Sequence, residues 1–129
     1  MAAKQDSIVS GYARMWPRQV FGKSGLKKEE LEFLKHAGVY VLYRDDKPHY
    51  IGQAIKLHNR LWGHAVHAGG RYYHFWNFFS AFAVADPKHR NELEGILIAA
   101  MPTANSAKPR LKKERMPKGV RGLLAKINQ

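Results

Sequence analysis

The chain has 129 residues, no cysteine and a formal net charge of +12. This length supports one folded domain with its own core, and the lack of cysteine excludes a disulfide framework and a thiolate zinc site. No apolar run reaches membrane-spanning length, and the N-terminus lacks the basic-then-apolar order of a signal peptide. We therefore expect a cytoplasmic protein with no membrane partner.

The positive charge is concentrated near the C-terminus. Segments 1–37, 38–105 and 106–129 carry net charges of +3, +2 and +7. A segment in which the charges nearly balance, followed by a basic arm, indicates a polyanionic partner. A tail that only aids solubility is the alternative. The arm residues expected on backbone phosphates are Lys108, Arg110, Lys112, Lys113 and Arg115.

The first part of the chain, residues 1–36, is interpreted as an N-terminal extension and a helix. Residues 1–26 are expected to hold one or two loose helical turns, because Pro17 and the FGKSG segment break any longer helix. The next segment, LKKEELEFLKHAG, predicts a helix with Leu31 and Leu34 on its apolar side. This helix would cover one face of a sheet that belongs to a core at 37–105.

Residues 38–52, GVYVLYRDDKPHYIG, predict two antiparallel strands joined at Asp45-Asp46. A three-residue loop over 44–46 would set Tyr40 opposite Tyr50. A two-residue turn at Asp45-Asp46 would instead set Tyr40 opposite Ile51. In either register the two phenols are expected to be neighbours.

The segment that begins at Leu57, LHNRLWGHAVHA, has helical periodicity. On a helical wheel Leu57, Leu61, Ala65 and Ala68 share one face. Arg60, His64 and His67 fall together at the edge of that face. The helix should therefore turn a cationic, proton-transferring strip toward the two tyrosine-bearing strands.

Residues 77–84 predict a third strand, and the segment before them interleaves aromatic and basic side chains. Such a segment suits stacking on bases or packing on sugars. Arg71, Tyr72 and Tyr73, with His67 from the preceding helix, are therefore candidate nucleic-acid contacts. For Tyr72, Tyr73 and Trp76 a place in the core is an equal alternative.

A second helix is predicted over 87–101, with Asp86 as its N-cap and a stop at Pro102. Glu94 falls within the apolar face of this helix, whereas Glu92 lies on the opposite side. A carboxylate that points into an apolar face needs a cation nearby, since an unpaired buried charge is costly. That cation is either Arg60 in an ion pair or a divalent metal. A short helix is expected at 120–127.

Together these segments resemble the successive motifs of the GIY-YIG nuclease family. Gly38-Val39-Tyr40, Tyr50-Ile51-Gly52, an arginine in LHNRLWGH and the segment ELEGILIAAMPTAN follow in the family's order, with valine in place of isoleucine in the first. The resemblance covers residues 38–105. It implies an α+β fold, with a small three-stranded antiparallel sheet flanked by helices.

The resemblance also implies an active site. Its catalytic residues would be Tyr40, Tyr50, Arg60, His64, Glu94 and Asn105, with Glu94 as the ligand of a Mg²⁺ or Mn²⁺ ion. The planar fork of Arg60 suits phosphate, and a phenol that takes a proton from water needs help from positive charge or from His64. We expect Tyr40 to act with His64, and Tyr50 to position water or phosphate.

The expected activity is metal-dependent hydrolysis of DNA phosphodiester bonds, leaving 5′-phosphate and 3′-hydroxyl ends. A non-catalytic DNA-binding or repair-accessory module on the same fold is the alternative from another class, and an RNA nuclease is a third. Whether the DNA is single- or double-stranded, and whether the protein is a monomer or a homodimer, is left open by the sequence. A zinc site on His64 and His67 lacks further ligands at suitable spacing.

Overall fold

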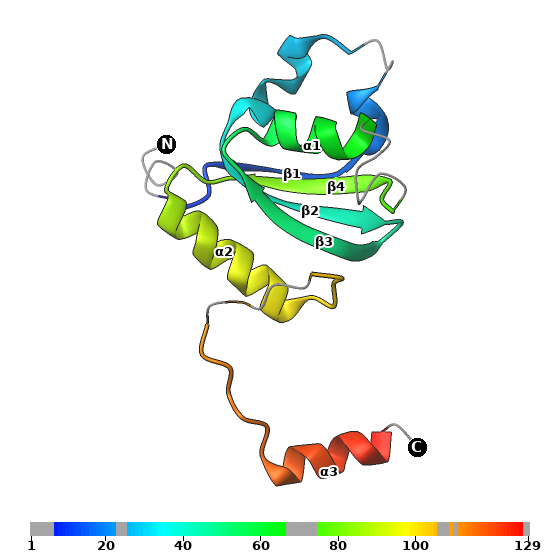
Figure 1. Ribbon diagram of the computed structural model, residues 1–129, viewed down its shortest axis with the longest axis vertical. Helices are drawn as coiled ribbons and strands as arrows, with labels where there is room; N and C mark the ends of the chain where they lie inside the picture. The colour runs from blue at the N-terminus through cyan, green and yellow to red at the C-terminus, as the bar shows by residue number, and fades with distance from the viewer. Residues whose placement is uncertain (1–6, 23–25, 67–74, 106–108, 110, 128–129) are drawn as a thin grey trace.

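The computed structural model describes residues 7–22, 26–66, 75–105, 109 and 111–127. The elements are, in chain order, β1 (Gly11–Pro17), the 3₁₀ helices η2 (Arg18–Phe21) and η3 (Lys28–Lys35), β2 (Gly38–Arg44), β3 (Lys47–Ala54), α1 (Leu57–Val66), β4 (Phe78–Ala83), α2 (Pro87–Ala100) and α3 (Lys118–Ile127). Figure 1 shows a sheet with α1 on one face and α2 on the other, and α3 set apart from both.

The strands form one antiparallel sheet in the order β1-β4-β2-β3. The α+β class is confirmed, but the sheet has a fourth strand where only three were expected. The additional strand, β1, lies in the segment for which only loose helical turns were predicted. A register shift between Ala13 and Trp16 and a positive φ of 55° at Met15 interrupt its alternation. Such a bulge hides the strand pattern in the sequence.

Two hydrophobic cores lie on opposite faces of the sheet. On one face Leu57 and Leu61 of α1, both fully buried, pack with Leu42 and Phe79 of the strands. On the other face α2 packs against the valines and isoleucine of β2 and β3; this core contains Val39, Val41, Ile51, Leu93, Leu97, Ile98 and Met101. The alternation along β2 therefore sends Tyr40 into the α1 layer and its neighbours into the α2 layer.

The hairpin between β2 and β3 has the two-residue turn, with Arg44 paired to Lys47. A bulge between Tyr43 and Leu42 then shifts the pairing of the two strands by one residue. Tyr40 consequently pairs with Gly52, so both predicted partners of Tyr40, Tyr50 and Ile51, are wrong. The phenols of Tyr40 and Tyr50 are nevertheless neighbours, with ring centroids 6.2 Å apart, as expected.

The helices lie where the sequence predicts them, but one of them is of a different type. Helix α2 begins as predicted, and the carboxylate of its N-cap Asp86 accepts a hydrogen bond from the Lys88 amide. The segment at 28–35 is a 3₁₀ helix, kinked at Leu31, where an ordinary helix was expected. The predicted helix at 120–127 is confirmed as α3.

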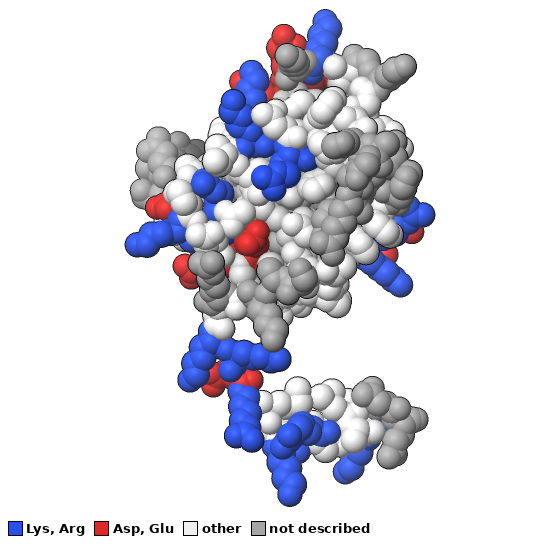
Figure 2. All heavy atoms as spheres, viewed as in Figure 1, with Lys and Arg blue, Asp and Glu red and all other residues white. Residues whose placement is uncertain are grey.

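The C-terminal arm projects from the core. Every residue from 111 to 127 is exposed, and Figure 2 shows lysine and arginine side chains gathered along this segment. Among the described residues, no helix is long and apolar enough to cross a membrane.

Candidate active site

The β3 edge strand lacks a side chain where the phenol of Tyr40 crosses it. Tyr40 pairs with Gly52, and a Cβ built on Gly52 would lie 2.5 Å from Oη and 2.6 Å from Cζ of Tyr40. Real Cβ atoms do not approach other atoms so closely. The glycine of the Tyr50-Ile51-Gly52 motif therefore makes room for the tyrosine of the first motif.

Three rings meet at this point. The centroids of Tyr40 and His64 are 5.6 Å apart, those of Tyr50 and His64 6.1 Å, and those of Tyr40 and Tyr50 6.2 Å. The Tyr40 hydroxyl lies 2.9 Å from Nε2 of His64. Strands β2 and β3 supply the phenols and α1 supplies the imidazole, so three elements fix the cluster.

The protonation states of the pair follow from its surroundings. Burial, and then the positive charge of Arg60, lower the pKa of His64 to about 4. Burial is also the main cause that raises the pKa of Tyr40 above its ordinary value, followed by Tyr50. At neutral pH the pair is a phenol and a neutral imidazole, so the Tyr40 hydroxyl can donate a hydrogen bond to Nε2 of His64.

The charges of Arg60 and Glu94 shift the pKa of the Tyr40 phenol in opposite senses. The charge of Arg60, together with its hydrogen bonding to Tyr40, lowers the pKa of Tyr40, whereas the charge of Glu94 raises it. Glu94 is half-buried and Glu92 is exposed, which agrees with their predicted places on opposite sides of the helix. Ion pairs in the described part of the chain do not join Arg60 to Glu94.

The residues of the site differ in their exposure to solvent. Tyr40 is fully buried, whereas Tyr50, His64 and Glu94 are half-buried and Arg60 is exposed. A ligand arriving from solvent would therefore meet the guanidinium first. The phenol of Tyr40 forms an inner layer beneath the other groups.

Two side chains that the sequence analysis did not assign to the site hold the end of α1 that carries His64. Nη2 of Arg18 donates to the Ala65 carbonyl at 2.7 Å, and Nη1 donates to the Trp76 carbonyl at 3.2 Å. Nε1 of Trp76 donates to the His64 carbonyl at 3.4 Å. Trp76 is almost fully buried, which settles its open assignment in favour of the core. The order WPR at 16–18 gave no signal of this role.

The Asn105 side chain braces the edge strand. Its Oδ1 accepts from the Ile51 amide at 2.9 Å, and its Nδ2 donates to the Ile51 carbonyl at 2.8 Å. The nearby Ala104 amide donates to the His49 carbonyl at 2.8 Å. Asn105 therefore holds the backbone between Tyr50 and Gly52 by satisfying the groups that an edge strand leaves unpaired.

The candidate nucleic-acid contacts fall largely outside the described residues. This applies to His67, Arg71, Tyr72, Tyr73, Lys108 and Arg110. The remaining three, Lys112, Lys113 and Arg115, are exposed in the segment before α3. Lys112 pairs with Glu114 at 3.4 Å.

The donor groups suit a weakly held hard cation. No group of three or more histidine, cysteine, aspartate or glutamate side chains that could hold a metal ion occurs within the described ranges. Among the carboxylates that the structure describes, only that of Glu94 is half-buried, and its charge acts on the Tyr40 phenol. Mg²⁺ retains most of its water and takes further oxygens from substrate phosphate, so one carboxylate is compatible with it.

The comparisons with known proteins give structural neighbours only. No protein-family model and no curated protein matches the chain. The chain is similar to crystal structures of the GIY-YIG N-terminal endonuclease domain of UvrC from Thermotoga maritima. The magnesium-bound form is 25% identical, with a TM-score of 0.45 over 57% of this chain and 90% of that chain. A variant of the same domain, bound to its catalytic divalent cation, gives the same identity and TM-score over 89% of that chain.

Proposed function

We propose that the protein is a metal-dependent endonuclease of the GIY-YIG type that hydrolyses DNA phosphodiester bonds. One observation carries the proposal: the Tyr40 phenol is hydrogen-bonded to His64 of α1, and the charges of Arg60 of α1 and Glu94 of α2 both shift its pKa. Arg60 carries a planar guanidinium that suits phosphate, and Glu94 is the one half-buried carboxylate among the described residues. Phosphodiester hydrolysis needs activation of water, compensation of charge on the non-bridging oxygens and stabilisation of the leaving oxygen, and these groups can supply all three.

The proposed reaction begins with the binding of a backbone phosphate by Arg60. The planar guanidinium can donate two parallel hydrogen bonds to the non-bridging oxygens and compensate their growing charge. This contact would draw Arg60 away from Tyr40, which in the resting site is fully buried. Water then reaches the phenol.

Tyr40 and His64 relay the proton of the attacking water. The water gives a proton to the Tyr40 oxygen as the Tyr40 hydroxyl passes its own proton to Nε2 of His64, which is 2.9 Å away. The hydroxide oxygen bonds to phosphorus, and the bond from phosphorus to the 3′ oxygen breaks. Its electron pair stays on the 3′ oxygen, which takes a proton from solvent to become the 3′-hydroxyl. Tyr50, half-buried beside both rings, positions the water or the phosphate by its hydroxyl.

Glu94 would hold the divalent cation, Mg²⁺ or Mn²⁺. When bound, the ion supplies Lewis-acid stabilisation of the leaving 3′ oxygen. With a single protein carboxylate we expect weak metal affinity in the absence of DNA. The products would be a 5′-phosphate and a 3′-hydroxyl.

The test is a cleavage assay on single-stranded, duplex and branched DNA and on RNA, with Mg²⁺, comparing Glu94→Gln with Glu92→Gln. Both variants remove one carboxylate from α2, but only Glu94 lies at the site. We expect DNA cleavage by the wild type and Glu92→Gln, and a loss of about 10²-fold or more in Glu94→Gln.

Three outcomes would contradict the proposal. Binding of every substrate without nicking would leave a non-catalytic nucleic-acid module. Cleavage of RNA alone would assign a different substrate. Equal activity in the two glutamate variants would remove Glu94 from the mechanism.

A further inference from the structure

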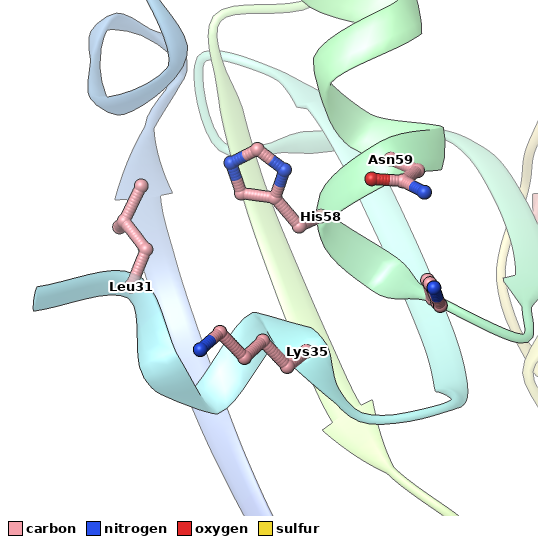
Figure 3. A pocket seen from close by; sticks show the side chains of 5 residues that line it. Leu31, Lys35, His58 and Asn59 are labelled. Carbon is pink, nitrogen blue, oxygen red and sulfur yellow. The ribbon is translucent and has the colours of Figure 1, made fainter. Parts of the chain in front are cut away.

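A cavity of about 380 Å³ lies between η3 and the first turn of α1. Figure 3 shows Leu31 and Lys35 on the η3 side and His58 and Asn59 on the α1 side. Lys56, which precedes α1, completes the described lining. None of these residues belongs to the cluster around Tyr40.

The lining combines an apolar wall with nitrogen donors. Leu31 is 8% exposed and supplies the wall, while Lys35 and Lys56 carry ammonium groups and His58 and Asn59 carry further nitrogens. The lining contains no carboxylate among its described members. Glu32 pairs with Lys35 at 2.8 Å, but both side chains are more than 60% exposed. Such pairs are weak, so the ammonium remains able to contact an anion.

The cavity lies next to the proposed phosphate contact. The Arg60 amide donates to the Lys56 carbonyl at 3.3 Å, so Lys56 and Arg60 are one helical turn apart. A turn of α-helix rises about 5.4 Å. That rise is comparable to the step between neighbouring phosphates of a nucleic-acid strand. A strand with its scissile phosphate on Arg60 would therefore bring an adjacent phosphate near Lys56.

We propose that this cavity binds a nucleotide of the substrate strand beside the scissile phosphate, with its backbone phosphate on Lys56 and Lys35 and its apolar surface against Leu31. The identity of the ligand as a nucleic-acid strand rests on the proposed function. The cavity itself is a separate site, which contributes binding and no chemistry. It lengthens the strand footprint by one nucleotide toward the N-terminal end of α1.

The test measures binding of the full chain to a fluorescein-labelled single-stranded 12-mer in EDTA, so that no cleavage is required. Lys56→Gln and Lys35→Gln are compared with Lys88→Gln, an exposed lysine on α2. We expect each cavity variant to bind about 5- to 20-fold more weakly, and its salt slope to fall by about 0.7 for each lost contact with a single strand. Lys88→Gln should change affinity less than about twofold.

A scan of neutral methylphosphonate linkages along the same 12-mer then locates the contact. We expect one linkage whose neutralisation weakens binding by the wild type and leaves Lys56→Gln unaffected. Equal losses in Lys88→Gln and Lys56→Gln, or a scan with no coupled linkage, would overturn the proposal. Thermal unfolding of each variant checks that the fold is retained.

The failure of this proposal and the failure of the proposed function give different results. If one linkage affects binding by the wild type but not by Lys56→Gln, and no substrate is cleaved, the cavity binds nucleic acid but the protein is not a nuclease. If DNA is cleaved but no linkage distinguishes the wild type from Lys56→Gln, the protein is a nuclease but the cavity does not bind the strand.

Discussion

Tyr40 and Gly52 face each other across the β2–β3 ladder, and the phenol of the first occupies the space that a side chain on the second would need. This relationship gives the glycine of the second motif a physical purpose. It lets a fully buried tyrosine reach the edge of the sheet, where His64 of α1 and Glu94 of α2 can both influence it.

Gly52→Ala should both destabilise the protein and reduce its activity. The new Cβ would meet the Tyr40 phenol, so we expect a loss of about 1–3 kcal/mol of unfolding free energy and displacement of the phenol from His64. Urea unfolding and the cleavage assay measure the two effects. Gly63→Ala is the matched control, because nothing lies within 4 Å of a Cβ there.

In α1, the Gly63→Ala exchange should raise stability by up to about 1 kcal/mol, because alanine favours a helix more than glycine does. Activity should be retained. If Gly52→Ala were as stable and as active as Gly63→Ala, the close packing of Tyr40 on the edge strand would not be needed.

Tyr40→Phe should abolish most of the cleavage while leaving DNA binding intact. The ring still fills the core, but the hydroxyl that relays the proton is gone, so we expect a rate loss of about 10²- to 10³-fold. The lost hydrogen bond to His64 should cost about 1 kcal/mol of stability. Single-turnover rates at saturating Mg²⁺ separate this effect from binding.

The control for that variant is Tyr43→Phe, on the same strand but in the α2 layer. It should cleave at nearly the wild-type rate. Comparable losses in the two variants would indicate a general defect of β2 and would count against the relay.

Replacement of His64 should change how stability depends on pH. Its pKa is lowered from the ordinary 6.5 to about 4 in the folded protein. The neutral ring therefore contributes stability that is complete above pH 6.5 and is lost as the pH falls toward 4. Because the ring is half-exposed, solvent screening reduces the effect, and we expect about 1–2 kcal/mol between these pH values.

Urea unfolding of the wild type, His64→Gln and His36→Gln at pH 7 and pH 4.5 measures this difference. The wild type and His36→Gln should lose more stability on acidification than His64→Gln, because His36 is exposed and its ring contacts Phe33. Parallel losses in all three proteins would show that His64 titrates normally.

Asn105→Ala should loosen the edge strand without touching the reacting groups. Both backbone groups of Ile51 lose their partner, so local opening should become easier by about 1–3 kcal/mol. Amide exchange at Ile51 should then accelerate about 5- to 150-fold. Cleavage should fall while DNA affinity is unchanged, as expected for a positioning residue.

Asn91→Ala provides the comparison, since its amide accepts a hydrogen bond from Gln53 at the surface. Exchange at Ile51 should be unchanged in this variant. Unaltered exchange in Asn105→Ala would mean that the bracing contact has no effect on the strand.

The sequence by itself determined the positions of most elements and the side of α1 on which His64 faces Tyr40 and Tyr50. Runs of β-branched and aromatic residues with turn signals located β2, β3 and β4, and Asp86 with Pro87 located the start of α2. Helical periodicity located α1, because burial on one face imposes a period of 3.6. It also separated Glu94 from Glu92, since a wheel position fixes which side of α2 each occupies. These are local properties, and the chain carries them without reference to its fold.

Only the tertiary structure decided the register, the fourth strand and the bracing contacts. The bulges beyond Tyr43 and Ala13 each add a residue to one strand, which no alternation pattern reveals. The bonds from Arg18 to the end of α1 and from Asn105 to Ile51 join residues 47 and 54 positions apart. Backbone groups accept such partners from any polar side chain, so their pairing is set by packing in three dimensions.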